Sequence, residues 1–159
     1  MPRWLSDDEE RAWRALQLME LRLEAELAHD LAAAGDLSYS EYLVLVGLTD
    51  VDGGRLRSFE LAVHLSWERS RLSHLAARME ARGLLTREAC ESDRRGSYLQ
   101  LSEAGRRAIE EAAPVHLASV RRLFFDHLTA AQVVAVGDAA ASVLAALGHG
   151  AAGHLGQPG

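Results

Sequence analysis

Arginine side chains occur in two places where their spacing suits contact with a polyanion. One set falls in a helical pattern between Trp67 and Arg82, and the other is the adjacent pair Arg94 and Arg95. A guanidinium pairs with guanine edges or with phosphate oxygens. Two adjacent arginines in a turn contribute little to a core and suit contact with phosphate. The pattern predicts nucleic-acid binding, and its alternative is the solvated arginine face that any amphipathic helix can carry.

The segment 67–82 has the periodicity of an amphipathic helix. Apolar residues recur at i, i+3, i+4 and i+7, namely Leu72, Leu75, Ala76 and Met79. Small or polar residues occupy the opposite side, namely Ser70, His74, Ala77 and Ala81. One flank of that side carries Arg71, His74, Arg78 and Arg82. A slim outer face edged with arginine suits the major groove of DNA.

The neighbouring segments complete a compact unit around this helix. Ser58 is expected to cap a short preceding helix, and Gly83 is expected to end the second one. Residues 84–89 and 97–101 read as two short strands, and Glu91–Gly96 between them has the composition of a turn. Helix, turn, helix and hairpin in this order predict a winged helix-turn-helix, which places one helix in a groove and one loop on the backbone beside it.

The run from Leu61 to Arg106 resembles the DNA-binding core of the MarR family of bacterial transcription regulators. The matching pieces are Leu61-Ala62, Ser73–Leu75, Glu80-Ala81-Arg82-Gly83-Leu84, Asp93-x-Arg95 and Leu101-Ser102-x-x-Gly105. Their order and spacing are specific together, and the resemblance covers about residues 4–147. It implies a homodimer that binds double-stranded DNA at a roughly palindromic operator. The helix 67–82 would be the recognition helix, and Arg94 and Arg95 would form the wing tip.

The pattern and the resemblance together give the candidate site residues. DNA contact is expected from Arg69, Ser70, Arg71, Ser73, His74, Arg78, Arg94 and Arg95. The resemblance implies that Asp93 holds the wing arginine in place, and the alternative is a plain turn-forming aspartate. Relatives commonly bind small aromatic or phenolic ligands between the dimer helices and the DNA-reading part. Candidates for such a pocket are Trp13, Tyr39, Tyr42 and His64, each of which is equally at home in an ordinary core.

The charge distribution supports this interpretation although the net charge of the chain is −6. Residues 51–107 carry 11 Arg against 8 acidic side chains, whereas the segments before and after them are net acidic. Contact with phosphate depends on this local potential more than on the total charge.

Cys90 is the one cysteine, so an internal disulfide framework is excluded. With no signal peptide and no apolar stretch of about 20 residues, we expect a cytoplasmic protein without a membrane span.

Long helices are predicted on both sides of this unit. Ser6 and Glu9 match a capping box for a helix through Ala34, whose two apolar stripes predict packing against its own domain and a partner subunit. Ser38 is expected to cap a helix at Tyr39–Thr49.

After the hairpin, Ser102 is expected to begin a helix through about His127, which Pro114 should kink or interrupt. Thr129 and Gln132 match another capping box and open a last helix. Its inward residues are expected to be Val133, Val136, Ala140, Val143, Leu144 and Leu147.

The sequence thus predicts a mainly α fold with a small β wing in a single domain over residues 1–147. The dimerisation helices would be formed by residues 4–36 and 102–147. The winged helix-turn-helix would span residues 38–101, and residues 148–159 would form a disordered tail. The expected function is that of a sequence-specific transcription regulator, a repressor released by a small-molecule ligand. No motif indicates catalysis, a cofactor or a metal site. Two alternatives remain, namely a metal- or oxidant-sensing regulator on the same fold and a protein-interaction module that has lost DNA binding.

Overall fold

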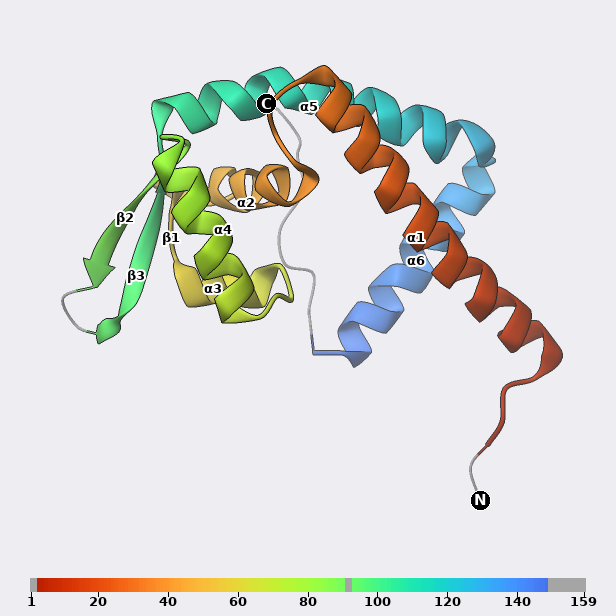
Figure 1. Cartoon of the computed structure of the whole chain (residues 1–159). Helices are drawn as coiled ribbons and strands as arrows, with labels where there is room; N and C mark the ends of the chain where they lie inside the picture. The colour runs from red at the N-terminus through yellow and green to blue at the C-terminus, as the bar shows by residue number, and fades with distance from the viewer. Residues whose placement is uncertain (1–2, 91–92, 149–159) are drawn as a thin grey trace.

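The computed structural model describes residues 3–90 and 93–148, and side chains within these ranges except those of residues 90 and 93–95. This part of the chain is mainly helical with one small antiparallel sheet, so the predicted fold class is confirmed (Figure 1). The elements are α1 (Asp7–Ala34), α2 (Tyr39–Thr49), the 3₁₀ turn η1 (Asp52–Gly54), β1 (Arg55–Arg57), α3 (Ser58–His64), α4 (Arg69–Ala81), β2 (Leu85–Cys90), β3 (Asp93–Leu101), α5 (Glu103–Leu123), the 3₁₀ turn η2 (Phe125–His127) and α6 (Ala130–Ala146).

Capping boxes begin three of these helices where the sequence predicts them. In each box the capping side chain accepts a backbone N–H from the third helical residue, whose own side chain accepts the N–H of the cap. The pairs are Ser6 with Glu9 for α1, Ser38 with Glu41 for α2, and Thr129 with Gln132 for α6. Because these contacts satisfy backbone donors that the helices leave open, each helix begins at a defined residue.

The start of α3 differs from the prediction, since Ser58 is the first helical residue and not the cap. Arg57 occupies the N-cap position, and its backbone N–H donates to the Glu60 carboxylate at 3.3 Å. The physical reason is that β1 runs directly into α3, so that Arg57 still pairs with Tyr98 in the sheet. The Ser58 hydroxyl is consequently available to another element, and it accepts a hydrogen bond from Ser97 at 3.2 Å.

The recognition helix α4 is shorter than the predicted span 67–82. Ser66 lies in the left-handed region with a φ of 54°, and the N–H of Trp67 donates back to the carbonyl of Ala62 at 2.8 Å. This bond closes the turn between α3 and α4, so Trp67 belongs to the turn and Glu68 becomes the N-cap. The helix begins two residues later than the apolar periodicity suggests.

Gly83 ends this segment as predicted. Its φ of +74° is a conformation that favours glycine, and its N–H donates to the carbonyl of Glu80 at 2.9 Å. The N–H of Leu84 donates to the carbonyl of Met79 at 3.0 Å. This pair of bonds is a helix C-terminal motif that turns the chain sharply into β2.

The wing hairpin is longer than predicted, because β3 already begins at Asp93. Residues 93–96, expected in a turn, therefore belong to the strand. A bulge between Ala89 and Cys90 shifts the register so that Cys90 pairs with Asp93. The sheet order is β1-β3-β2, and the short strand β1 pairs antiparallel with β3.

The long helix after the wing is not interrupted at Pro114. α5 continues from Glu103 to Leu123 with Pro114 inside it. The proline removes one backbone hydrogen bond and crowds the carbonyl four residues back, but the helix runs through it. The chain then forms η2, so the predicted helix to His127 is in fact two elements. Within the described ranges no single helix has the length and apolar character to cross a membrane, although the α5–η2 segment and α6, bent by 108° to each other, pass that test as a pair.

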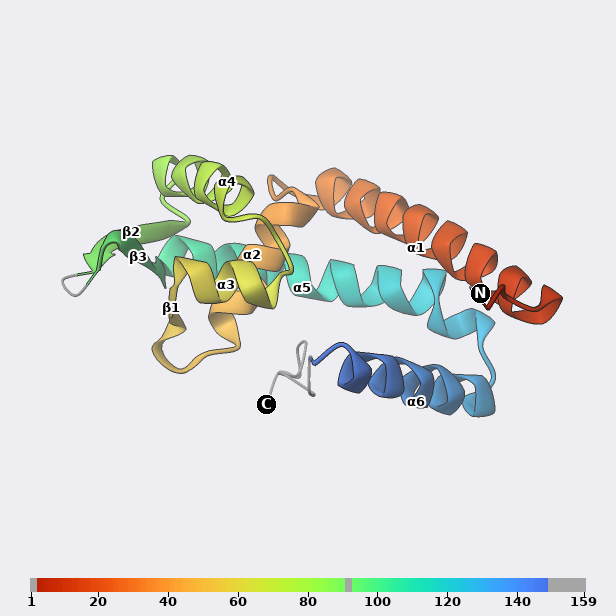
Figure 2. The ribbon, with the colours of Figure 1, turned by 90° about the horizontal axis from the view of Figure 1, so that it is seen from below.

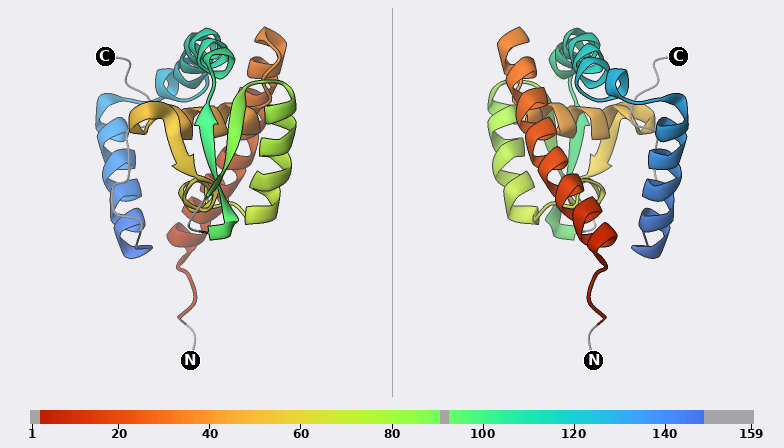
Figure 3. Two further views of the ribbon diagram at one scale, coloured as in Figure 1. Left: turned by 90° about the vertical axis from the view of Figure 1, so that its left-hand side faces the viewer. Right: turned by 90° about the vertical axis from the view of Figure 1, so that its right-hand side faces the viewer.

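The core lies between α2, α3, α4, the sheet and the first half of α5. Its largest fully buried side chains are Val44, Leu45, Leu48, Leu61, Leu72, Met79, Leu85 and Leu99. α1 joins this core only near its end, through Leu31. The recognition unit, by which we mean α3, α4 and the wing of β2 and β3, is therefore supported from behind by α2 and α5 (Figure 3).

Helix α6 behaves differently from the prediction, since its apolar row does not face inward within this chain. α5 lies between α1 and α6, which extend on opposite sides of it (Figure 2). Every residue of α6 is exposed. The exposed fractions are 37% for Val133, 44% for Val136, 58% for Val143, 46% for Leu144 and 64% for Leu147. Nothing within residues 3–90 and 93–148 buries this row.

Candidate nucleic-acid interface

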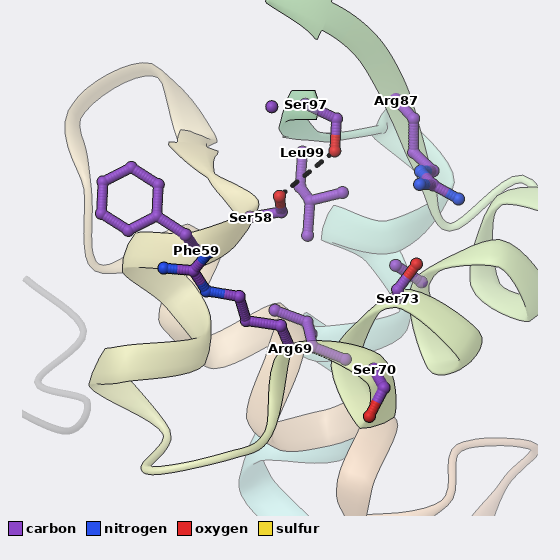
Figure 4. A pocket seen from close by; sticks show the side chains of 11 residues that line it. Ser58, Phe59, Arg69, Ser70, Ser73, Arg87, Ser97 and Leu99 are labelled. Atoms are coloured by element: carbon purple, nitrogen blue, oxygen red, sulfur yellow. Dashed lines mark hydrogen bonds between the residues drawn. The ribbon is translucent and has the colours of Figure 1, made fainter. Parts of the chain in front are cut away.

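A cleft of about 520 Å³ opens between α3, α4 and the wing (Figure 4). Its polar lining consists of serine hydroxyls and guanidinium groups, namely Ser58, Ser70, Ser73, Ser97, Arg69 and Arg87. Phe59, Leu72, Ala76 and Leu99 supply apolar parts of its wall. Among the described side chains, the lining contains no carboxylate, and both of its charged side chains are cations. Such a lining suits an anion with several acceptor oxygens, as a phosphate diester has.

Hydrogen bonds join the elements that form the cleft to one another. Ser97 of β3 donates to Ser58 of α3 at 3.2 Å, and the backbone N–H of Arg87 in β2 donates to the Glu80 carboxylate of α4 at 3.2 Å. The wing is thus tied both to α3 and to α4. In Figure 4, Arg87 and Ser73 approach the cleft from two different elements. The Ser58 and Ser97 hydroxyls and the backbone of Arg87 are thus held in place by contacts within the chain.

Arg69 stands at the start of α4, where the helix meets the cleft. Its guanidinium lies 5.9 Å from the centre of the Phe59 ring, an arrangement that Figure 4 shows from close by. An exposed cation over an aromatic face gains about 0.5–1 kcal/mol. The side chain is therefore oriented along α3 while its donors remain exposed at the mouth of the cleft.

The outer face of α4 matches the predicted division into buried and exposed residues. Leu72, Leu75, Ala76 and Met79 are buried, and all six candidate contact residues of this helix are exposed, namely Arg69, Ser70, Arg71, Ser73, His74 and Arg78. The structure divides these candidates into groups. Arg69, Ser70 and Ser73 line the cleft, whereas His74 and Arg78 lie farther round the exposed side.

Arg71 points to the other side of α4, toward α2. Its guanidinium lies 4.0 Å from the centre of the Trp67 ring and donates to the Ser40 hydroxyl at 3.5 Å, the long limit of a hydrogen bond. It lines a separate crevice with Glu20, Glu24, Tyr39 and Trp67, among other residues. In this arrangement Arg71 already has protein partners, so contact with DNA would require it to leave them.

The candidate residues at the wing tip have only their backbone described. Arg94 and Arg95 belong to β3, next to the bulged end of the hairpin. The side chains of Cys90, Asp93, Arg94 and Arg95 lie outside the described residues, and so does the predicted tail from residue 149 onward. The expectations for the wing cations, the supporting aspartate and the cysteine thiol therefore stay predictions.

Three polar residues of the cleft were not among the sequence candidates, namely Ser58, Arg87 and Ser97. The sequence does contain a signal for Arg87, because strand alternation places its side chain on the same face of the sheet as that of Leu85. In the structure Arg87 pairs with Leu99 across the sheet. The meeting of Ser58 and Ser97 has no comparable local signal. It depends on how β1, β3 and the start of α3 are arranged in space.

The four candidates for a ligand pocket are placed unequally. Tyr39 lines the crevice beside Arg71, and Tyr42 is buried with its ring centre 4.6 Å from that of His116. Trp13 is 53% exposed, about two turns before the α1 residues of that crevice, and His64 is exposed at the end of α3. The structure thus brings Tyr39 and Tyr42 together around His116, without Trp13 or His64.

His116 of α5 is the histidine with the most perturbed surroundings. Its ring is 6.0 Å from that of Tyr39, and its buried Nδ1 has no hydrogen-bond partner within the described residues. Burial lowers the pKa of His116, because the cationic form is poorly solvated there. No group of three or more His, Cys, Asp or Glu side chains in the described ranges is placed to hold a metal ion.

Comparison with known proteins gives consistent results. A family model described as MarR family matches residues 35–96. AbsC, a MarR family transcriptional regulator from Streptomyces coelicolor, is 39% identical with a TM-score of 0.82, and the match covers 92% of this chain and 98% of that one. Sco3205, a MarR family transcriptional regulator from the same organism solved in complex with DNA, is 37% identical with a TM-score of 0.82 over 89% of each chain.

A more distant structure shares the fold. BpsR of Bordetella bronchiseptica, whose DNA binding is regulated by 6-hydroxynicotinic acid, is 20% identical with a TM-score of 0.70, over 84% of this chain and 98% of that one. No curated protein matches the chain in sequence.

Proposed function

The chain belongs to the MarR family of transcriptional regulators, and from this premise we propose that it is a cytoplasmic, homodimeric repressor that a small-molecule ligand releases from DNA. That it is a DNA-binding regulator and not an enzyme follows from the family. The sign of regulation, the dimer, the operator and the ligand belong to the proposal. We further propose that residues 1–147 form one domain, with 38–101 as its winged helix-turn-helix.

The observation that carries the proposal is the cleft between α3, α4 and the wing. Among the described residues, its charged side chains are two cations, Arg69 of α4 and Arg87 of β2, and its four serine hydroxyls come from α3, α4 and β3. Phosphate contacts fix the register of a protein on a duplex, and base contacts then read the sequence. We assign the phosphate contacts to Arg69 and Arg87 of the cleft, together with Arg94 and Arg95 of the wing.

Base readout is assigned to the exposed centre of α4. Ser70, Ser73 and His74 are short side chains there, so the helix backbone can come close to base edges. Arg78 lies farther along the same exposed side. Arg71 is assigned a conditional role, because it must give up Trp67 and Ser40 before it can reach a groove.

Dimerisation is supported by the apolar surface that a single chain leaves uncovered. The row on α6 is one part of it, and the segment from Trp4 into α1 is another, with Trp4 84%, Leu5 55%, Trp13 53% and Leu21 70% exposed. Contiguous apolar surface of this kind marks an interface. A twofold dimer presents two copies of α4, which accounts for a roughly palindromic operator with half-sites about one turn of DNA apart.

Release by a ligand is proposed as a population shift. A ligand can move the equilibrium only through a difference in affinity between the DNA-binding arrangement and another one. The crevice lined by Tyr39, Trp67 and Arg71 lies between α1, α2 and α4, so a molecule bound there would contact both the recognition helix and α1. The regulation of BpsR by 6-hydroxynicotinic acid is a precedent in a protein of the same fold.

The proposal is tested by selecting duplexes from a random-sequence pool with the wild-type protein and titrating the enriched sequence at several salt concentrations. We expect one enriched, roughly palindromic sequence. We also expect the affinity to fall linearly on a logarithmic salt scale, because bound phosphates release counterions. In the double variant Arg69→Ala, Arg87→Ala this slope should decrease by about 2. Arg106→Ala, which removes an exposed cation of α5 outside the cleft, is the matched control.

Failure to enrich any sequence would overturn specific DNA binding. An unchanged salt slope in the double variant would overturn the assignment of the cleft while leaving specific binding intact.

A further inference from the structure

Arg82 follows the last residue of α4 and is directed away from the DNA-facing cleft. Its guanidinium donates to the Glu41 carboxylate at 2.7 Å and to the backbone carbonyl of Asp36 at 2.8 Å. Asp36 belongs to the connection between α1 and α2, and Glu41 lies in the first turn of α2. A single side chain therefore joins the end of the recognition helix to the junction of α1 and α2.

The acceptor of this contact is itself fixed. The Glu41 side chain is only 8% exposed, and its second oxygen accepts from both the N–H and the hydroxyl of Ser38 at 2.9 Å. A guanidinium has a rigid fork of donors, so two acceptors in fixed positions define its orientation. Among the described ion pairs, this is the one with the most buried carboxylate.

The contact joins two parts of the protein that have different proposed roles. α1 supplies part of the proposed dimer interface, whereas α4 reads the DNA. Arg71 makes a second, longer contact from α4 to Ser40, the residue next to Glu41. Arg71 within α4 and Arg82 at its C-cap thus hold this helix to the start of α2, which follows α1 in the chain.

We propose that Arg82 is a positioning residue that fixes the orientation of α4 relative to α1, and that it thereby sets the half-site spacing that the dimer accepts. The inference rests on the proposed function, since it requires a dimer and an operator with two half-sites. One additional base pair moves a half-site by about 3.4 Å and about 34° around the duplex. A dimer whose recognition helices are rigidly oriented rejects this change, whereas one with loosely held helices tolerates it.

A purely structural role for the contact predicts a different result. In that case its loss lowers the stability of the fold and leaves the preference among spacings unchanged. The two roles are separated by measuring spacing preference and stability on the same variants.

The experiment uses the full-length protein and the duplex that the wild type selects from a random pool. Affinity is measured for this duplex, for versions with one base pair added or removed between the half-sites, and for a duplex with a single half-site. The variants are Arg82→Gln, Arg82→Lys and Glu41→Gln. Arg122→Gln is the matched control, because it breaks a 2.6 Å ion pair with Asp30 that does not involve α4.

We expect the wild type and Arg122→Gln to prefer the selected spacing by at least about tenfold, in the range of a base-pair mismatch. Arg82→Gln and Glu41→Gln should reduce this preference to about threefold or less and keep single half-site affinity within about twofold of wild type. Arg82→Lys should fall between them, because it retains the charge with a less rigid geometry. Thermal unfolding identifies the temperature at which each variant is folded, and Arg82→Lys provides the test if Arg82→Gln does not fold.

A full spacing preference in folded Arg82→Gln, or an equal loss of affinity for every duplex, would overturn the positioning role and leave the proposed function intact. Failure of the wild type to select any sequence would overturn both.

Discussion

The Ser97 hydroxyl donates to the Ser58 hydroxyl at 3.2 Å. This bond joins β3 of the wing to the first turn of α3. Both groups line the cleft that we assign to phosphate contact. The wing and the helix pair are therefore linked where they would meet the DNA backbone. A regulator of this design binds with a wing that is positioned in advance, so less conformational entropy is lost on binding.

Ser97→Ala tests this link. The hydrogen bond is part-buried and neutral, so we expect its removal to lower the free energy of unfolding by about 1 kcal/mol and to weaken DNA binding. In a double variant with Ser58→Ala the losses should not add, since both substitutions remove the same bond. Urea unfolding and duplex titration measure the two effects. Ser142→Ala, on exposed α6, is the control, and additive losses at Ser58 and Ser97 would show that the two hydroxyls act separately.

His74→Ala tests the division between base readout and phosphate contact. His74 lies at the centre of the exposed side of α4, so we expect affinity for the selected duplex to fall by about 1–3 kcal/mol, with much less effect on a random duplex. Arg87→Ala should weaken binding to both duplexes alike. Titration of each variant with both duplexes gives the comparison. An equal effect of His74→Ala on the two duplexes would remove this residue from sequence readout.

The local elements of the fold could be predicted well because their signals are local. Ser38 and Glu41 are three residues apart and specify the start of α2, and Gly83 marks the end of α4 by its conformation. Boundaries failed where a turn contact that the hydrophobic periodicity does not show decides them. Trp67 leaves the helical pattern because its N–H closes a turn on Ala62.

The candidate site could be predicted only in part for the same reason. Periodicity separates the buried and exposed sides of α4, but it cannot tell which exposed cations already have partners. Arg71 stacks on Trp67, and Arg82 is bound by Glu41, 41 residues away along the chain. Ser58 and Ser97 become neighbours only through the pairing of β1 with β3.

Gly105→Ala is expected to destabilise the fold by about 3 kcal/mol, because a methyl group there would lie 2.0 Å from the backbone carbonyl oxygen of Leu84. A backbone atom cannot move aside as a side chain can, so α5 would have to shift away from the wing. Gly35→Ala is the control, since nothing lies within 4 Å of its added carbon and its extended backbone suits any residue. Chemical denaturation compares the two variants, and equal stability would show that α5 shifts at little cost.

Acid is expected to weaken the fold partly through Glu41. Burial alone would raise the pKa of this carboxyl, but the hydrogen bonds from Ser38 and Arg82 outweigh it and hold the pKa below its ordinary value of 4.5. A lowered pKa in the folded state stabilises the fold fully above pH 4.5, and this contribution is lost as the pH falls toward the folded-state pKa. Urea unfolding at several pH values below 5 should therefore show a smaller acid-induced loss in Glu41→Gln than in wild type. An identical slope in both proteins would show that Glu41 does not carry the effect.

The apolar row of α6 gives the sharpest test of the dimer. Val143 and Leu144 lie in this row and are 58% and 46% exposed in the single chain. If a partner covers them, the double variant Val143→Glu, Leu144→Glu buries carboxylates at a cost of several kcal/mol each and should dissociate the dimer. Val134→Glu is the matched control, because Val134 is 62% exposed but lies about a quarter of a turn from the nearest residues of the row. Sedimentation velocity at micromolar concentration should show a monomer for the double variant and a dimer for the control.

The monomer should also lose its preference for the two-site duplex over the single half-site, because the two recognition helices are then no longer linked. A double variant that remains dimeric would place the interface away from α6, and the exposed apolar residues of α1 would then be the next surface to substitute.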